Sequence, residues 1–577
     1  MELHNQVIEL VVHPTAAWAP EITTTDIRQK LDGPEGTSDW SESLLNPKNR
    51  IDSLDDYPSA LWRVDGCAGL GTQFYAIPTF LQKIPPMRMD VFIPEDQTPR
   101  IRRQLDLSVA FHTKDGLRLS RLAVSRFIVR VLQHWTQTEF ADFDAFERFY
   151  TSAPFGSRIV FENLSLDVRQ VDVRIGLNHN LERQLMPLSS LAKLWGPEVV
   201  LPEVIEFQDL HVVKVLHDSV CLVEYQKQLF IFKALTSGAK YLYHELKTLC
   251  TMEPHPNVIA YPMHLVQKDC KFGGKKAICG FTTFYHAKGT LRDILPPLRA
   301  HGQLATEDQV KWALQLAGAL KHLRQHSFGY YPDLRLDNIV LSEGGDVVMI
   351  DFEQRGVWCE FAAPEVNAIE YMRLIAEQED FPDNLKEAYL DKLIAVVPEY
   401  ESLQADKYSN PENGYNGAGL ALSPREQEAA EVYMLGRVLW CIFEGVSGPQ
   451  KAAVWQSYRW EPHIEFPDFE RCPAAIRSLI EDCTRGRRPP LSRTVMRKSS
   501  RMVLEGALHG GHQTPENVIA AASAFWASEV EFATKFLDER AALKARGELD
   551  DNYYGRPALE EVFQRLDDFR AGNAAAR

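Results

Sequence analysis

The chain has 577 residues, of which 45% are hydrophobic and 25% charged, and its net charge is -16. The length predicts roughly two to four structural units, and the composition is ordinary for a globular protein. An acidic surface repels the phosphates of nucleic acids and of anionic lipids, so the composition argues against both as partners. Apolar runs such as residues 432–443 are too short to predict a membrane span.

Nine cysteines are scattered singly along the chain, without a C-x-x-C pair. This pattern argues against a disulfide framework or a zinc site and favours a reducing compartment. The first residues lack a basic start followed by a long apolar core, so we expect no secretory signal. Together these features predict a cytoplasmic or nuclear protein.

Residues 1–190 are expected to form an α+β unit, whose role the sequence does not indicate. Apolar residues recur near helical spacing over 117–135, which predicts a helix. Apolar and polar residues alternate over 159–175, which predicts one or two half-buried strands.

The pattern changes at about residue 205, where short apolar runs predict successive strands up to residue 286. Helical patterns dominate 287–500, and 501–577 also reads as helical. One predicted helix covers 306–326, where Thr306 and Gln309 have capping-box spacing. Strands followed by helices predict an α+β fold with a small sheet-rich lobe and a larger helical lobe.

The strongest chemical signal lies in residues 330–356, YYPDLRLDNIVLSEGGDVVMIDFEQRG. Phosphoryl transfer needs a carboxylate that orients the attacking hydroxyl, and an amide and a second carboxylate that bind metal. Asp333, Asn338 and Asp351 supply these groups. Between the last two, the runs IVL and VVMI flank the turn SEGGD, which predicts a β-hairpin that returns Asp351 to the side of Asn338.

This order and spacing resemble the H-R-D-L-x-x-x-N and D-F-G motifs of the eukaryotic protein kinase superfamily. PHPNVI at 254–259, the run GTLRDIL and Ala363-Pro364-Glu365 agree with the same family, and IDFEQRG resembles a fungal protein-kinase-like group. The resemblance implies a bilobal kinase domain, with an N-lobe at 205–286 and a C-lobe at 287–500. An N-terminal domain at 1–190 would precede it, and a helical extension at 501–577 would follow.

The resemblance also implies a role for each site residue, with ATP and Mg²⁺ as cofactors. Asp333 and Arg335 would be catalytic, and Asn338 and Asp351 would bind the metal. The nucleotide would be bound by these two metal ligands and by Lys233, Glu245, the gatekeeper Thr283 and the hinge residues Phe284, Tyr285 and His286. Arg488 would pair with Glu365 inside the C-lobe.

Several positions depart from the family pattern. Leu216, Asp218 and Cys221 stand where the phosphate-covering loop has glycines, which normally let the backbone approach phosphate closely. Glu353 replaces the glycine of D-F-G, and Pro332 replaces the arginine of H-R-D. The segment 354–362, QRGVWCEFA, contains no Ser, Thr or Tyr, so it cannot carry a hydroxyl phosphorylation.

Three functions therefore compete. The chain could be an active kinase that phosphorylates protein hydroxyls, a pseudokinase that binds nucleotide or partners without turnover, or a small-molecule kinase of the aminoglycoside-phosphotransferase type. The retained Lys233, Asp333, Asn338 and Asp351 favour an enzyme, and the missing glycines favour the scaffold. The acceptor, a protein or small-molecule hydroxyl, and the oligomeric state are left open by the sequence.

Overall fold

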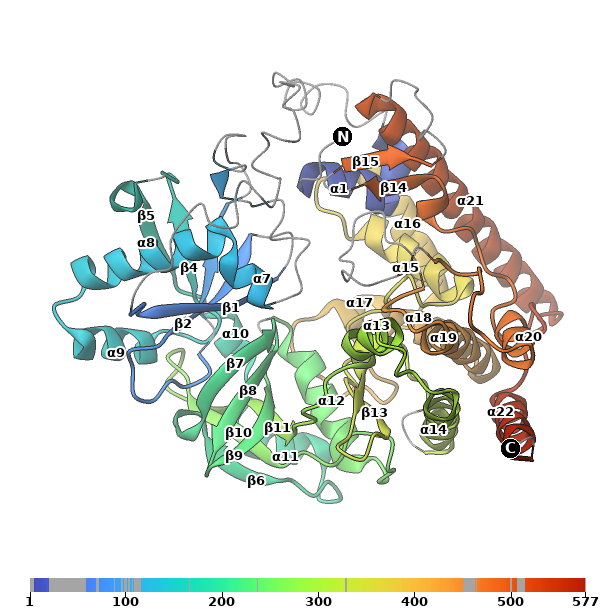
Figure 1. The fold of residues 1–577 in the computed structure, drawn as a ribbon, viewed down its shortest axis with the longest axis horizontal. Helices are drawn as coiled ribbons and strands as arrows, with labels where there is room; N and C mark the ends of the chain where they lie inside the picture. Colours follow the sequence, from blue (N-terminus) through green and yellow to red (C-terminus); the bar gives the residue numbers. More distant parts are fainter. Residues whose placement is uncertain are drawn as a thin grey trace.

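The computed structural model describes residues 5–19, 59–68, 72–87, 89–94, 97, 101, 104–105, 107, 116–165, 167–235, 237–326, 329–449, 462, 464–498, 501–505 and 514–575. Within these ranges the chain is a mixed α+β fold with two mixed sheets and a helical C-terminal portion, as expected for the class (Figure 1). In the part of the chain so described, each helix is too short or too polar to cross a membrane.

The first sheet has five strands in the order β1-β2-β3-β4-β5, and only β3 and β4 run parallel. Its aromatic core surrounds Trp62, whose ring lies 5.5 Å from Phe146 and 6.5 Å from Trp135. The helix expected over 117–135 is two helices, because Leu122 is extended (φ -67°, ψ 149°). The elements are β1 (Trp62–Ala68), β2 (Gln73–Pro78), β3 (Asp90–Phe92), α7 (Gly116–Arg121), α8 (Ala123–Glu139), α9 (Phe143–Ser152), β4 (Arg158–Glu162), η2 (Val168–Gln170) and β5 (Asp172–Gly176).

The second sheet has six strands in the order β6-β10-β11-β9-β8-β7, with β6 parallel to β10. The chain turns around Phe272–Gly274, and β10 and β11 pair antiparallel on either side of this turn. The elements are α10 (Asn180–Gln184), α11 (Leu188–Trp195), β6 (Glu203–Glu206), η3 (Phe207–Asp209), β7 (His211–His217), β8 (Val220–Tyr225), β9 (Gln228–Lys233), α12 (Ala239–Thr251), β10 (His264–Asp269) and β11 (Lys276–Phe284).

The two sheets meet where β1 lies beside β7. The Val215 N–H donates to Oδ2 of Asp65 at 2.8 Å, and Nη2 of Arg63 donates to the Val213 carbonyl at 2.8 Å. These bonds use side chains of β1 to satisfy backbone groups of β7, an outer strand that would otherwise present unpaired groups. The N-terminal unit is thereby attached to the strand that leads into the β7–β8 turn.

The helical part is built around α19, whose residues from Ala429 to Glu444 are all buried. Ser423 and Glu426 form a capping box at its start, Pro424 occupies the first turn, and Gly445 ends it with φ 70°. A helix that is buried on all sides needs mostly apolar residues on every face, which explains the long apolar run in the sequence. The elements are α13 (Leu291–Ala300), α14 (Thr306–Gln325), η4 (Leu336–Asn338), β12 (Ile339–Leu341), β13 (Val347–Met349), α15 (Pro364–Ala376), α16 (Asp383–Val396), α17 (Tyr400–Gln404), α18 (Gly417–Ala421), α19 (Pro424–Glu444) and α20 (Ala474–Cys483).

The capping box expected at Thr306 and Gln309 is wrong. Ala305 is the N-cap of α14 and offers no side-chain acceptor. The Gln309 side chain instead donates to the carbonyls of Ile442 and Phe443, at 2.6 and 3.1 Å. It therefore satisfies carbonyls at the C-terminal end of α19, where a helix lacks internal donors.

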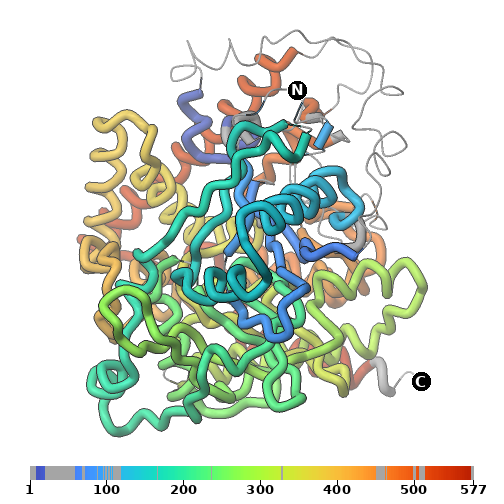
Figure 2. Tube along the Cα trace, turned by 90° about the vertical axis from the view of Figure 1, so that its left-hand side faces the viewer, coloured from blue at the N-terminus to red at the C-terminus, as the bar shows by residue number. Residues whose placement is uncertain are grey.

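The first residues of the chain pack against the C-terminal helices rather than against the first sheet, as the two views of Figures 1 and 2 agree. The indole N–H of Trp526 donates to the Val11 carbonyl at 2.7 Å, and the Ser523 hydroxyl donates to the Ala17 carbonyl at 3.2 Å. The two ends of the chain thus form one unit, built from α1 (Asn5–Val12), η1 (Pro14–Trp18), η5 (Leu491–Arg493), β14 (Val495–Lys498), β15 (Arg501–Leu504) and α21 (Pro515–Arg546). The helix α22 (Leu559–Ala575) packs instead against α14, α20 and α19.

The expected ion pair between Glu365 and Arg488 is also wrong. Glu365 pairs with Arg556, which precedes α22, through two hydrogen bonds, and both side chains are fully buried. Arg488 pairs instead with Glu529 of α21 at 2.7 Å. The C-terminal residues therefore neutralise a carboxylate buried at the start of α15.

Candidate functional site

Lys233, at the end of β9, lies at the centre of a buried ion-pair network. Its Nζ lies 2.7 Å from Oε2 of Glu245 on α12 and 2.5 Å from Oδ1 of Asp351, which follows β13. Lys233 is 8% exposed and Glu245 is 2% exposed. Lys233 and Asp351 are thus in direct contact although they lie 118 positions apart, as a shared site requires.

Two backbone contacts hold the Asp351 segment against its neighbours. The Phe352 N–H donates to Oε1 of Glu245 at 2.9 Å, so one carboxylate binds both Lys233 and the segment after β13. The Phe352 ring lies 5.2 Å from the Tyr331 ring, and the Tyr331 hydroxyl donates to the Ile350 carbonyl at 2.5 Å. The position of α12 is therefore coupled to that of Asp351.

Asp351 has φ 65°, in the left-handed region that side chains other than glycine rarely adopt. Such strain persists only where surrounding contacts hold the residue, and it gathers at functional sites. The hairpin of β12 and β13 is confirmed. Its register ends with the Ile350 N–H donating to the Asn338 carbonyl at 2.9 Å, which places Asn338 beside the strained residue.

Asp333, Arg335 and Asn338 form a second group, in the loop before β12. The Asn338 side-chain N–H₂ donates to Oδ2 of Asp333 at 3.0 Å, and Nε of Arg335 lies 3.0 Å from the same oxygen. The Arg335 guanidinium also lies 5.0 Å from the centre of the Trp358 ring. These contacts fix the Asp333 carboxylate and give it one cationic neighbour.

The pKa shifts divide the carboxylates into two kinds. Burial raises the pKa of Asp333 to about 6, although Arg335 opposes the shift. Burial also acts to raise the pKa of Asp351, but the charge and hydrogen bond of Lys233 outweigh it, and the pKa falls below its usual value. Asp351 is therefore ionised at neutral pH, whereas Asp333 titrates close to it.

Glu353 adds a third carboxylate that sequence reasoning treated only as a lost glycine. Its Oε2 lies 3.7 Å from Nζ of Lys233, and its Oε1 lies 2.7 Å from Nε of Arg355. Burial raises the pKa of Glu353, while Lys233 lowers it. Oxygen atoms of Glu245, Asp351 and Glu353 lie within 4.8 Å of one another, so three acids surround one ammonium group. The signal for this role was the acid directly after Asp351-Phe352.

The turn between β7 and β8 contributes further charge. The charge of the Asp218 carboxylate raises the pKa of Glu353, and the charge of the His217 imidazole lowers the pKa of Asp351. Asp218 therefore stands close to this site, as its alignment with a glycine of the phosphate-covering loop predicts. A negative charge there disfavours phosphate.

The expected adenine-binding residues lie at the end of β11. Phe281 pairs with Lys233 and Thr283 with Ile231, and because side chains alternate along a strand, Thr283 emerges on the same face as Lys233. Phe284 is 53% exposed, whereas Thr283 is 9% exposed. Burial lowers the pKa of His286, and its carbonyl accepts from the Gly289 N–H at 3.2 Å. Of the expected hinge residues, Phe284 ends β11, and Tyr285 and His286 follow it directly.

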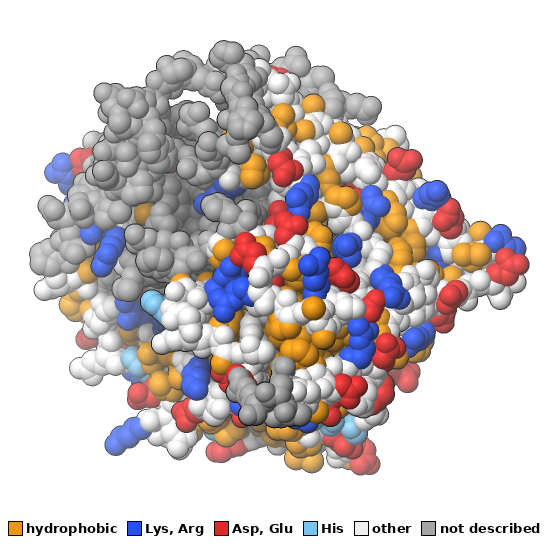
Figure 3. Space-filling view, turned by 45° about the vertical axis from the view of Figure 1, so that its right-hand side comes forward, with side chains coloured by type: hydrophobic (Ala, Val, Ile, Leu, Met, Phe, Trp, Pro, Cys, Tyr) orange, Lys and Arg blue, Asp and Glu red, His pale blue; other side chains and the backbone are white. Residues whose placement is uncertain are grey.

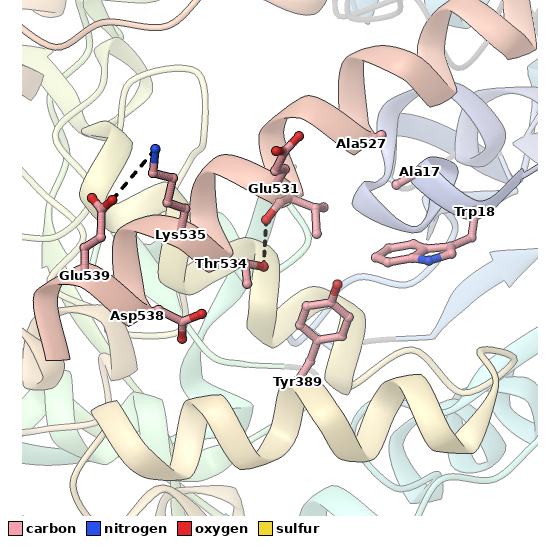
Figure 4. A pocket seen from close by; sticks show the side chains of 10 residues that line it. Ala17, Trp18, Tyr389, Ala527, Glu531, Thr534, Lys535, Asp538 and Glu539 are labelled. Carbon is pink, nitrogen blue, oxygen red and sulfur yellow. Dashed lines mark hydrogen bonds and ion pairs between the residues drawn. The ribbon is translucent and has the colours of Figure 1, made fainter. Parts of the chain in front are cut away.

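A cavity of about 530 Å³ lies elsewhere. Figure 4 shows it between α21, Tyr389 of α16 and Trp18. A second cavity, of about 310 Å³, lies along α21 near Tyr553. No residue that lines either cavity belongs to the Lys233 or Asp333 groups. On the face drawn in Figure 3, basic and acidic side chains are interspersed among apolar ones.

Comparisons with protein-family models and with curated proteins found no match for this chain.

Proposed function

We propose that the chain is an ATP-dependent phosphotransferase of the protein-kinase type, which acts on a protein hydroxyl. The observation that carries the proposal is the buried contact of Lys233 with Glu245 and Asp351, combined with the Phe352 N–H bond to Glu245. Kinase activity requires the strand lysine, the helix glutamate and the metal-binding aspartate to be in place together. The six-stranded sheet with α12, followed by the helical part, supports a bilobal arrangement over 205–500.

In this reaction the acceptor oxygen forms a bond to the γ-phosphorus of ATP, and the bond from that phosphorus to the β-γ bridging oxygen breaks. ADP leaves with the electron pair, and Asp333 takes the proton of the acceptor hydroxyl. A base with a pKa of about 6 is mostly ionised at neutral pH and can accept that proton. Arg335 places a positive charge beside Asp333, where the transferred phosphoryl group would carry negative charge.

The residues present fit Mg²⁺, a hard cation that takes oxygen ligands. Asp351 would bind it as an ionised carboxylate. Asn338, which donates through Nδ2 to Asp333, would offer its amide oxygen. Bound there, the ion would neutralise charge on the β- and γ-phosphates. Lys233 would then exchange its bond to Asp351 for the phosphates.

A second candidate, a pseudokinase scaffold that binds nucleotide or partners without turnover, is favoured by one specific observation. Lys233 is already occupied by Asp351 and faces Glu353, while Asp218 lies nearby on a turn without glycine. These acids disfavour triphosphate. A small-molecule kinase shares the same chemistry and differs in the acceptor, which the assay below distinguishes.

The test is transfer of the γ-phosphate of ATP, measured in single turnover beside Mg²⁺-dependent nucleotide binding. Peptide and small-molecule hydroxyls serve as separate acceptors. Asp333→Asn should lower turnover by roughly 10²–10⁴ and leave ATP affinity nearly intact, since it removes only the proton acceptor. Asp351→Asn, the matched control, should weaken Mg²⁺-dependent binding as well. If wild type and Asp333→Asn bind ATP and turn it over equally, the proposed phosphotransfer is contradicted and the scaffold is supported.

A further inference from the structure

Trp358 lies in the hydroxyl-free segment 354–362 and contacts the loop that carries Asp333. The 5.0 Å from the Arg335 guanidinium carbon to the Trp358 ring centre lies within the range of cation–π attraction, about 6 Å. The same guanidinium forms the 3.0 Å ion pair with Asp333. One arginine therefore joins the indole to the carboxylate proposed to accept the proton.

The indole is itself held in place by neighbouring groups. Its Nε1–H donates to Oε2 of Glu360 at 3.2 Å. The backbone directly after Trp358 is anchored: the Glu360 carbonyl accepts from Nη2 of Arg437 at 2.8 Å, and the Cys359 carbonyl accepts from the Asn367 side chain at 2.9 Å. Trp358 is thus tied to α19 and α15, the rigid helices beneath the segment.

Arg335 has a long side chain with several rotamers, and its charge is useful only where it meets the transferred phosphoryl group. A site that is ordered by phosphorylation would need a hydroxyl in 354–362 and a receiving arginine before Asp333, and the chain has neither, since Pro332 precedes Asp333. The contact of Trp358 with Arg335 forms in the unmodified chain.

We propose that Trp358 is a positioning residue, which holds the Arg335 guanidinium against Asp333 and replaces a phosphorylation-dependent contact. The inference rests on the proposed phosphotransfer for its effect on rate. The contact itself is independent of turnover, which allows the two to be tested separately.

The first arm measures kcat and KM for Trp358→Leu and Trp358→Phe on unphosphorylated protein. Loss of the aromatic face should lower kcat about 10- to 100-fold with a smaller change in the KM for ATP, because the charge is misplaced in the transition state. Trp358→Phe keeps an aromatic face and should recover part of the rate. Trp18→Leu, which changes another half-buried tryptophan, should leave kcat unchanged. If the wild type is active and Trp358→Leu has the same kcat, the inference about Trp358 is overturned while the proposed function stands.

The second arm uses ¹⁹F NMR on the full chain labelled with 5-fluorotryptophan, with the Trp358 signal assigned from Trp358→Phe. Arg335→Gln should shift that signal and leave the Trp18 signal in place. A Trp358 signal that does not respond overturns the inference whether or not the wild type turns over. A response in a protein that binds ATP without turnover supports the contact and counts against the proposed function.

Discussion

Two groups of buried charges differ in how they are balanced. At the start of α15, Glu365 and Arg556 meet one to one, with side chains 1% and 0% exposed. In the Lys233 cluster, three carboxylates surround one ammonium group, and a second cation, Arg355, reaches only Glu353. The first group is balanced within the chain, whereas the second has more carboxyl groups than cations, and burial raises the pKa of Glu245 to about 7 and also raises that of Glu353.

We interpret this difference as one between charges that serve the fold and charges that would bind a ligand under the proposed function. A buried pair is kept because removing either partner leaves an uncompensated charge. An excess of buried carboxylates is unfavourable by itself, and a bound cation would relieve it. We therefore expect substitutions in the first group to lower the free energy of unfolding, and substitutions in the second group to change ligand binding or the rate of reaction.

The largest effect is expected from Arg556→Ala, which leaves Glu365 buried without its cation. The free energy of unfolding should fall by about 3–5 kcal/mol. Chemical denaturation of the full chain measures it. Arg488→Ala, at a partly exposed pair, should cost no more than about 1 kcal/mol.

Adding Glu365→Gln to Arg556→Ala removes the stranded charge and should restore part of the loss. If the single Arg556→Ala variant is as stable as Arg488→Ala, the Glu365–Arg556 pair does not hold the two segments together.

The next largest effect concerns pH. Since Asp333 must lose its proton to act, and its pKa is raised to about 6, kcat/KM should rise about tenfold from pH 5 to pH 7. Asp351, whose pKa is lowered, stays ionised over this range. Arg335 lowers the pKa of Asp333, so Arg335→Gln should move the inflection upward. A flat profile over this range would contradict the role of Asp333.

The smallest effect is expected from Glu353→Gln, which removes one of the excess carboxylates. Mg²⁺-dependent ATP affinity should rise roughly three- to fivefold, or about 1 kcal/mol, because Lys233 loses a competitor for the phosphates. The free energy of unfolding should not fall. Glu343→Gln, an exposed position, serves as the control. Weaker binding by Glu353→Gln would mean that this carboxylate serves the ligand rather than competing with it.

The sequence predicted the parts of the site that depend on local spacing. Asn338 and Asp351 are joined by a short hairpin, so their approach follows from the turn between two strand patterns. The contact of Lys233 with Asp351 followed from motif order. The partner of Glu365 could not be found in this way, because Arg556 is 191 positions away. Several other arginines carry the same charge, and the sequence does not distinguish among them.

Two further features depended on tertiary contacts. Glu353 was treated as a missing glycine, and its place beside Lys233 became visible only once β9 and the segment after β13 lay together. Gln309 had the spacing of a capping residue, but the carbonyls at the end of α19 compete for its side chain. The local sequence pattern does not show which groups compete for Lys233 or for the Gln309 side chain.

The contact of Val11 with Trp526 has a consequence for the order of assembly, since these residues are 515 positions apart. During synthesis at about 5–20 residues per second, α1 would wait from about half a minute to nearly two minutes for α21 to appear. Among the described residues, its apolar side chains Ile8 and Val11 are buried in one cluster with residues of β14, β15 and α21. This unit can therefore form only after α21 has been synthesised. Until then the apolar side chains of α1 would be exposed in the unfinished chain, where chaperones could bind them.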